Sequence, residues 1–380
     1  MKAGTRSEPG LRGLPRRRSR SWVAMLTMLG GLALIAIGPA AGASAAGQRS
    51  PAASHGTGPP FVFAYITNLR ADTVSVVQTA TNAIVATIPV GDSPTAVAVA
   101  PDGRHVYVAN AVSGSVSVID TATNTVTATV SLPAGSAPLG IAVTPNDRTL
   151  YVTDSGANDV SVIDTATNAV IAVIRTDAEG NAVFNRPVGV AVTPDGRRVY
   201  VASSGRLLDI GDTVAVIDTA TNTVTGTIEV GFGPTAVAVA PNGRHVYVAN
   251  DTPSRFGQGS VSVIATATNQ VTATISGFEE PVGVAAAQNG RVYVTVIDTN
   301  EVAVIATPTN RVTTIRGFDS PVGVAVTPNG RLVYVTNTGR SSNVAVITAA
   351  TSTLTRTITG FTFPQAVAIG TVRTGGWPKR

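Results

Sequence analysis

The stretch PVGVAVTPDGRRVYVAS at residues 187–203 decides the fold. Apolar residues recur at every second position on both sides of PDGR, and this period of two is typical of β-strands. Asp-Gly supplies the positive φ of a tight hairpin turn, so the stretch predicts two antiparallel strands. Alternating segments follow at residues 214–217 and 224–228, on either side of a TATN turn. The complete unit is therefore a four-stranded antiparallel sheet.

The same unit recurs along the chain. All seven tyrosines occupy one equivalent position in it, namely Tyr65, Tyr107, Tyr151, Tyr200, Tyr247, Tyr293 and Tyr334. They lie 41 to 49 residues apart, which is the repeat length of a β-propeller blade. The first repeat begins at Phe61 without an innermost strand, and an extra copy of that strand, PQAVAIG, stands at residues 364–370. We therefore predict an all-β, seven-bladed β-propeller of four-stranded antiparallel blades, with the ring closed by the C-terminal strand.

Composition excludes several classes of protein. The chain has 380 residues, 44% apolar and 13% charged side chains and no cysteine, so it can bury a large core and is not a disulfide scaffold, a disordered chain or a coiled coil. The excess of positive charge lies in residues 1–45, and the remainder is nearly neutral. Without a basic stripe, no nucleic-acid partner is expected.

The N-terminal region has the order of a secretory signal. Basic residues 16–20 precede an apolar run at residues 22–38, and Ala43-Ser44-Ala45 forms a cleavage motif. Sec export is favoured over the twin-arginine route because residues 19–21 fit the latter motif poorly, and an uncleaved membrane anchor is the alternative. The predicted organisation is a signal peptide at 1–45, a flexible linker at 46–60, the propeller at 61–370 and a polar tail at 371–380.

Several motifs resemble one repeat family. VYVTN at residues 333–337, VYVAN at 106–110 and 246–250, and VIDTATN at 118–124 and 162–168 look like the YVTN-type β-propeller repeats of prokaryotic exported and surface-layer proteins. The resemblance implies a seven-bladed propeller that is secreted or held at the cell surface. It implies little about activity, because that family is defined by its repeat and not by an active site. Lactonases and quinoprotein-type subunits are distant seven-bladed relatives.

Little in the sequence predicts chemistry at the centre of the ring. The innermost strands contain no Asp, Glu or His, so we expect no metal there and no cofactor. His105 and His245 share one repeat position, which favours a structural role. The arginines of the PDGR turns are interpreted as a solvated rim balanced by Asp102, Asp147 and Asp195. These arginines are Arg104, Arg148, Arg197, Arg244, Arg291 and Arg331.

Three long loops single out one face of the ring. They span residues 175–186, 204–213 and 251–260, and loops on a rigid scaffold are where binding residues concentrate. Neutral drift in tolerant loops is the other explanation. In these loops we expect exposed apolar anchors at Phe184, Leu207, Leu208 and Phe256, together with charges that no other blade repeats. The predicted binding residues are Asp177, Glu179, Phe184, Arg186, Arg206, Leu207, Leu208, Asp209, Asp212, Asp251, Arg255 and Phe256.

These observations favour an exported, non-catalytic binding scaffold. Its expected partner is a protein or a cell-envelope polymer, its expected state is a monomer, and it would touch a membrane only through an uncleaved signal segment. One alternative is a lactonase-like hydrolase or lyase that uses loop carboxylates above the central channel. Those carboxylates are Asp177, Glu179, Asp209, Asp212 and Glu280. Another alternative is a structural surface-layer component.

Overall fold

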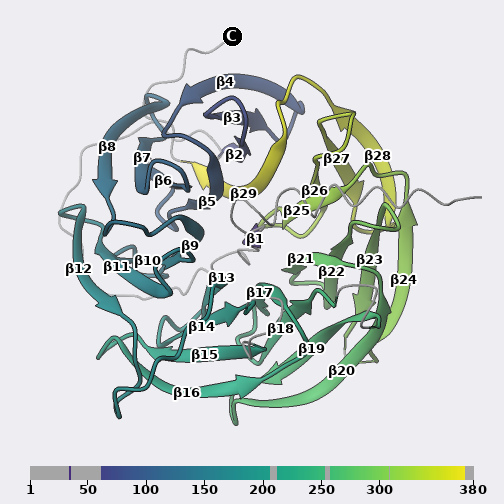
Figure 1. Ribbon diagram of the computed structural model, residues 1–380. Coiled ribbons are helices and arrows are strands. Elements are labelled where there is room, and N and C mark those ends of the chain that lie inside the picture. The colour runs from purple at the N-terminus through teal and green to yellow at the C-terminus, as the bar shows by residue number, and fades with distance from the viewer. Residues whose placement is uncertain (1–33, 36–60, 206–211, 253–256, 308, 373–380) are drawn as a thin grey trace, which may run out of the picture.

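The computed structural model describes residues 34–35, 61–205, 212–252, 257–307 and 309–372. Seven sheets stand around a common centre, and each contains four antiparallel strands that follow one another from the inside of the ring outwards (Figure 1). The predicted all-β, seven-bladed propeller is therefore confirmed. No membrane-spanning helix occurs among the residues that the structure describes.

The strands fall into four concentric sets. The innermost strands are β29 (Pro364–Val372), β5 (Pro94–Val99), β9 (Pro138–Val143), β13 (Pro187–Val192), β17 (Pro234–Val239), β21 (Pro281–Ala286) and β25 (Pro321–Val326). The second strands are β2 (Phe61–Asn68), β6 (His105–Asn110), β10 (Thr149–Asp154), β14 (Arg198–Ser203), β18 (His245–Asn250), β22 (Arg291–Val296) and β26 (Leu332–Asn337). We number the blades 1 to 7 in these orders.

The outer half of each blade follows in the same order. The third strands are β3 (Thr73–Gln78), β7 (Ser115–Asp120), β11 (Asp159–Asp164), β15 (Thr213–Asp218), β19 (Gly259–Ala265), β23 (Glu301–Ala306) and β27 (Asn343–Thr348). The outermost strands are β4 (Ala83–Pro89), β8 (Thr125–Ser131), β12 (Ala169–Ile174), β16 (Thr223–Glu229), β20 (Gln270–Phe278), β24 (Arg311–Arg316) and β28 (Thr353–Ile358). We call the face with the second-to-third connections and the blade-to-blade connections the long-loop face, and the opposite face the short-turn face.

Burial explains the sequence of each strand. The innermost strands are buried on both sides, as in β5, whereas the outermost strands alternate between exposed and half-buried residues, as in β4. The small residues at the centre are needed for close approach, since a Cβ on Gly140 would lie 2.2 Å from the Val188 carbonyl oxygen. The repeated tyrosines pack between blades, and the Tyr151 hydroxyl donates to Asn222 Oδ1 of the next blade at 2.6 Å.

Blade 1 is assembled from both ends of the propeller. Strand β29 pairs with β2 along its length, from Phe61 opposite Val372 to Asn68 opposite Pro364. The Ala366 amide also donates to Thr67 Oγ1 at 2.9 Å. The C-terminal strand therefore closes the ring, and it runs to Val372, two residues beyond the predicted end of the propeller.

A two-residue strand, β1 (Leu34–Ile35), lies at the centre of the ring (Figure 1). It pairs in parallel with β17 at Ala236 and Val237. Both of its residues fall within the predicted signal peptide.

Candidate functional site

The first long loop folds back on itself. The Asp177 carboxylate accepts hydrogen bonds from Asn181 Nδ2 at 3.0 Å and from the amides of Asn181 and Glu179. These bonds, led by the one from the Asn181 side chain, lower the pKa of Asp177. A parallel bridge joins Asp177 to Val224 of β16, so the loop lies against the outer strand of blade 4. Asp177 therefore organises its own loop, and Glu179 is exposed near its tip.

Two further predicted residues of this loop are placed differently from expectation. Phe184 is only 5% exposed and belongs to the core between blades 3 and 4. Its prediction as an exposed anchor is wrong, because the loop turns back over the gap between two blades and an aromatic ring fills that gap. Arg186 is half-buried with a φ of 51°, and its amide donates to Asn158 Oδ1 at 2.8 Å.

Asp212 has a role that other blades repeat. Its Oδ1 accepts from the Gly233 amide at 2.9 Å, which ties the second-to-third connection of blade 4 to the loop that leads into blade 5. Asp72 holds Ser93 in the same way at 2.8 Å. The prediction that Asp212 is an unrepeated charge is therefore wrong, since it is a structural tether.

Six of the predicted binding residues lie outside the described part of the chain. They are Arg206, Leu207, Leu208, Asp209, Arg255 and Phe256.

Three carboxyl groups meet on the long-loop face between blades 5 and 6, and we call them the acidic cluster: Asp251, Glu280 and Asp298. Asp251 follows β18, Glu280 precedes β21 and Asp298 follows β22. Burial, followed by the charge of Asp298, raises the pKa of Asp251 to about 6. Burial and the neighbouring charges of Asp251 and Asp298 raise the pKa of Glu280 to about 7. The cluster therefore holds a proton close to neutral pH.

One carboxylate oxygen of the acidic cluster lacks a hydrogen-bond donor in the described residues. Asp251 Oδ1 is buried and has no hydrogen-bond partner in the described residues. A cationic group that donates hydrogen bonds would satisfy this oxygen and neutralise the cluster, and each of these effects is favourable in a partly buried site. Across the described part of the chain, no group of three or more His, Cys, Asp or Glu residues could hold a metal ion.

The structure brings only some of the predicted acids together. Asp251 and Glu280 meet, whereas Asp177 and Glu179 lie in the loop that packs against β16. Sequence reasoning missed Asp298, which lies two residues after the end of β22. At the same position blades 2 and 3 carry Val112 and Gly156. An acid at a repeat position where these blades have an uncharged residue was the signal that could have identified Asp298.

Sequence reasoning also missed a buried pair of carboxyls in blade 3. Asp154 and Asp159 are both fully buried. Ser161 Oγ donates to Asp154 Oδ2 at 2.5 Å, and Arg175 Nε lies 2.9 Å from Asp159 Oδ2. Burial, followed by the charge of Asp159, raises the pKa of Asp154 to about 8, so Asp154 carries a proton at neutral pH.

The corresponding positions of blade 2 explain the role of this pair. There Asn110 Nδ2 donates to Ser115 Oγ at 3.2 Å and to Ser117 Oγ at 3.0 Å. A protonated Asp154 takes the place of that asparagine, and Arg175 balances the charge of Asp159. The pair therefore joins two strands and is structural.

Known proteins resemble different parts of this chain. Residues 17–132 match the YNCE-like β-propeller family, and residues 140–282 match the choice-of-anchor I domain. A search of curated proteins finds no significant match.

Solved structures of other proteins superpose on most of the chain. A functionally unknown protein from Desulfotomaculum acetoxidans has a TM-score of 0.67 at 16% identity over 82% of this chain and 99% of its own. Hydrazine synthase from Kuenenia stuttgartiensis has a TM-score of 0.63 at 22% identity, over 72% of this chain and 88% of its own. The dihydro-heme d1 dehydrogenase NirN has a TM-score of 0.58 at 16% identity, over 80% of this chain and 74% of its own. At these identities the likeness concerns the fold alone. The chain is therefore a seven-bladed β-propeller protein, and its residues 17–132 resemble the YNCE-like β-propellers.

Proposed function

We propose that this protein is an exported, non-catalytic binding scaffold of YVTN-type repeats, which recognises a protein or cell-envelope polymer through its long-loop face. The observation that carries the proposal is the acidic cluster. It combines a carboxylate oxygen without a partner on Asp251 with two carboxyls whose pKa values lie near neutrality. The preferred partner is one that presents a primary amine or a guanidinium group.

Rigid surroundings support this role. The amide of Asp251 donates to the Gly233 carbonyl at 2.9 Å, and the Ile297 amide donates to the Glu280 carbonyl at 3.1 Å. Backbone bonds thus hold two of the three acids before a partner arrives, which lowers the entropic cost of binding. The proposed export rests on the signal-like residues 1–45.

Binding of a lysine-containing peptide to the full-length chain tests the proposal. An oligolysine peptide is expected to bind the parent protein, and Asp251→Asn combined with Glu280→Gln should weaken that affinity at least tenfold. Asp177→Asn is the matched control, because Asp177 is an acid of the same face whose carboxylate accepts hydrogen bonds from its own loop. Unchanged affinity in the double variant, or equal losses in the control, would contradict the proposal.

A hydrolase remains the second candidate, because one observation favours it. The pKa of Glu280, at about 7, suits a general acid or base at neutral pH. A lactone or ester hydrolase should lose activity in Glu280→Gln, and the activity of the parent protein should change with an apparent pKa close to 7. Absence of turnover with a panel of lactones and esters, together with oligolysine binding, selects the scaffold.

A further inference from the structure

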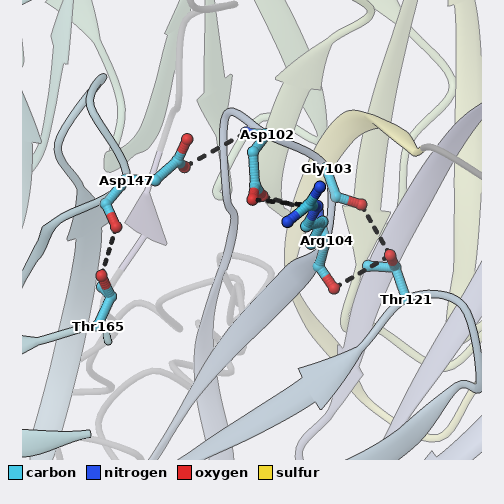
Figure 2. Close-up of polar contacts among 6 residues, drawn as sticks. All are labelled: Asp102, Gly103, Arg104, Thr121, Asp147 and Thr165. Atoms are coloured by element: carbon cyan, nitrogen blue, oxygen red, sulfur yellow. Dashed lines mark hydrogen bonds and ion pairs between the residues drawn. The ribbon is translucent and has the colours of Figure 1, made fainter. Parts of the chain in front are cut away.

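Charge is distributed unevenly on the short-turn face. The turns of blades 2 to 4 place acids beside bases, and Arg104 Nε lies 3.8 Å from Asp102 Oδ2 (Figure 2). The acids of these turns are Asp102, Asp120, Asp147, Asp164, Asp195 and Asp218. The turns of blades 5 to 7 carry Arg244, Arg291, Arg311 and Arg331, and their sequence contains no acid. The predicted balanced rim is therefore correct for blades 2 to 4 and wrong for blades 5 to 7.

A groove of about 640 Å³ opens in this cationic sector, between blades 5 and 6. Arg244, His245 and Arg291 line it, together with the amide side chains of Asn242, Gln288 and Asn310. Its other walls include alanine and valine side chains, and no carboxylate faces it among the described residues.

The repeat explains why a groove exists at this boundary. Between blades 4 and 5, the guanidinium of Arg198 reaches across and donates to the Thr266 carbonyl. The corresponding second-strand residue of blade 5 is His245, which is shorter and makes no such bond in the described chain. In addition, four residues join β21 to β22, whereas five join β17 to β18. The shorter side chain and the shorter turn together leave the space open.

Blades 2 and 3 provide an internal comparison. His105 occupies the same position in blade 2, but there Asp147 Oδ1 accepts from the Asp102 amide at 3.3 Å, and both carboxylates stand beside the boundary (Figure 2). Asn242 of blade 5 occupies the position of Asp102, since each side chain accepts a hydrogen bond from the amide of the arginine two residues later. Among the described blades, only the boundary of blades 5 and 6 combines a histidine with turns that contain no acid.

Arg291 uses its guanidinium to bond to the Ala349 carbonyl and to Ser352 Oγ of blade 7, but other donors in the groove are left available. At the boundary of blades 4 and 5 the Tyr200 hydroxyl donates to Asn269 Oδ1 at 2.7 Å. No corresponding bond joins Tyr247 to Asn310 in the described part of the chain, although both line the groove. Within the same described ranges, Arg244 forms no ion pair.

We propose that this groove binds a phosphorylated small molecule. Arg244 takes the phosphate through charge-assisted hydrogen bonds, Arg291 adds positive potential, and the amide side chains with His245 receive the polar body of the ligand. A volume of about 640 Å³ lies within the usual range for a small-molecule site and exceeds what a phosphate ion alone requires. The site is on the face opposite the acidic cluster and does not depend on the proposed scaffold function.

Calorimetric titration of the full-length chain with glucose 6-phosphate and with glucose tests this proposal. We expect saturable binding of the phosphorylated sugar and at least tenfold weaker binding of glucose. Arg244→Gln should weaken the binding of glucose 6-phosphate at least tenfold. Arg104→Gln, at the matching turn of blade 2, should leave it unchanged. Absence of binding, equal binding of both sugars, or equal losses in the two variants would overturn the proposal.

The variant His245→Arg distinguishes binding in the groove from non-specific attraction of the phosphate to the positively charged face. This change gives blade 5 a longer side chain like Arg198, which we expect to fill the groove and bond across it, so glucose 6-phosphate binding should be lost while the melting temperature is maintained. Non-specific attraction would instead grow with the added charge. Tighter binding of glucose 6-phosphate to a folded His245→Arg protein would therefore overturn the proposal. If His245→Arg fails to fold, Arg244→Gln still tests the proposal, because Arg244 is exposed and its replacement should not affect folding.

Discussion

At the scale of single residues, the carboxyl pair of blade 3 links stability to pH. The pKa of Asp154 is near its usual value of about 4 in an unfolded chain and is raised to about 8 in the folded protein. Between these values the folded state binds more protons than the unfolded state. The free energy of unfolding therefore falls as pH rises from about 4 to about 8.

Replacing Asp154 by asparagine should remove this dependence. The new amide side chain would donate to Asp159 and Ser161 without a titrating proton, as Asn110 does for its serines in blade 2. We expect Asp154→Asn to raise the stability at pH 8 by at least about 1.4 kcal/mol, the value of one pKa unit, and to change little at pH 4. Thermal unfolding at both pH values measures the difference.

The reciprocal change in blade 2 is the control for this prediction. Asn110→Asp introduces a buried carboxyl without an arginine such as Arg175, so it should lower stability, and more strongly at pH 8 than at pH 4. Parallel pH profiles of the Asp154→Asn and parent proteins would show that the carboxyl pair does not carry a proton.

Phe184 gives a second prediction at this scale. The ring is buried between blades 3 and 4, so Phe184→Ala should leave a cavity and lower the free energy of unfolding by about 3 to 5 kcal/mol. Phe61→Ala is the control, because Phe61 is 40% exposed and should cost much less. Denaturant unfolding compares the two. Equal small losses would mean that the loop does not pack against the core.

At the scale of elements, strand β29 is the part whose loss should matter most. Deleting residues 364–372 removes the innermost strand of blade 1 and uncovers the edge of β2, whose residues Ala64 to Ile66 are buried. An exposed apolar edge promotes aggregation, so we expect an insoluble product or a large fall in melting temperature. Deleting residues 373–380, which follow the strand, should leave melting unchanged. Similar melting curves for both truncations would contradict closure by β29.

The strands and their arrangement in a ring were the features that the sequence predicted best. Alternation of apolar residues, the PDGR and TATN turns and the tyrosine period are local signals, and each repeats, so the strands and the ring follow from them. The site was predicted less well. The partners of Phe184 and Asp251 come from neighbouring blades, and no local pattern states which side chains meet across a boundary.

At the scale of the whole molecule, the signal-like order of residues 1–45 predicts a shorter mature protein. Cleavage after Ala45 should yield an exported chain that begins at or near Ala46, without β1 at the ring centre and without the basic cluster. N-terminal sequencing of material from the culture medium or cell surface measures this. Retention of residues 1–20 would instead support an anchor, with β1 kept in place.

The join between β2 and β29 also constrains how the chain acquires its fold. Thr67 and Ala366 bond across 299 positions, so blade 1 stays incomplete until nearly the whole propeller has been synthesised. Six blades can form in order behind the ribosome, but the last contact must wait. The closed ring is therefore a late product of synthesis, and the chain gains its full stability only after nearly all of it has left the ribosome.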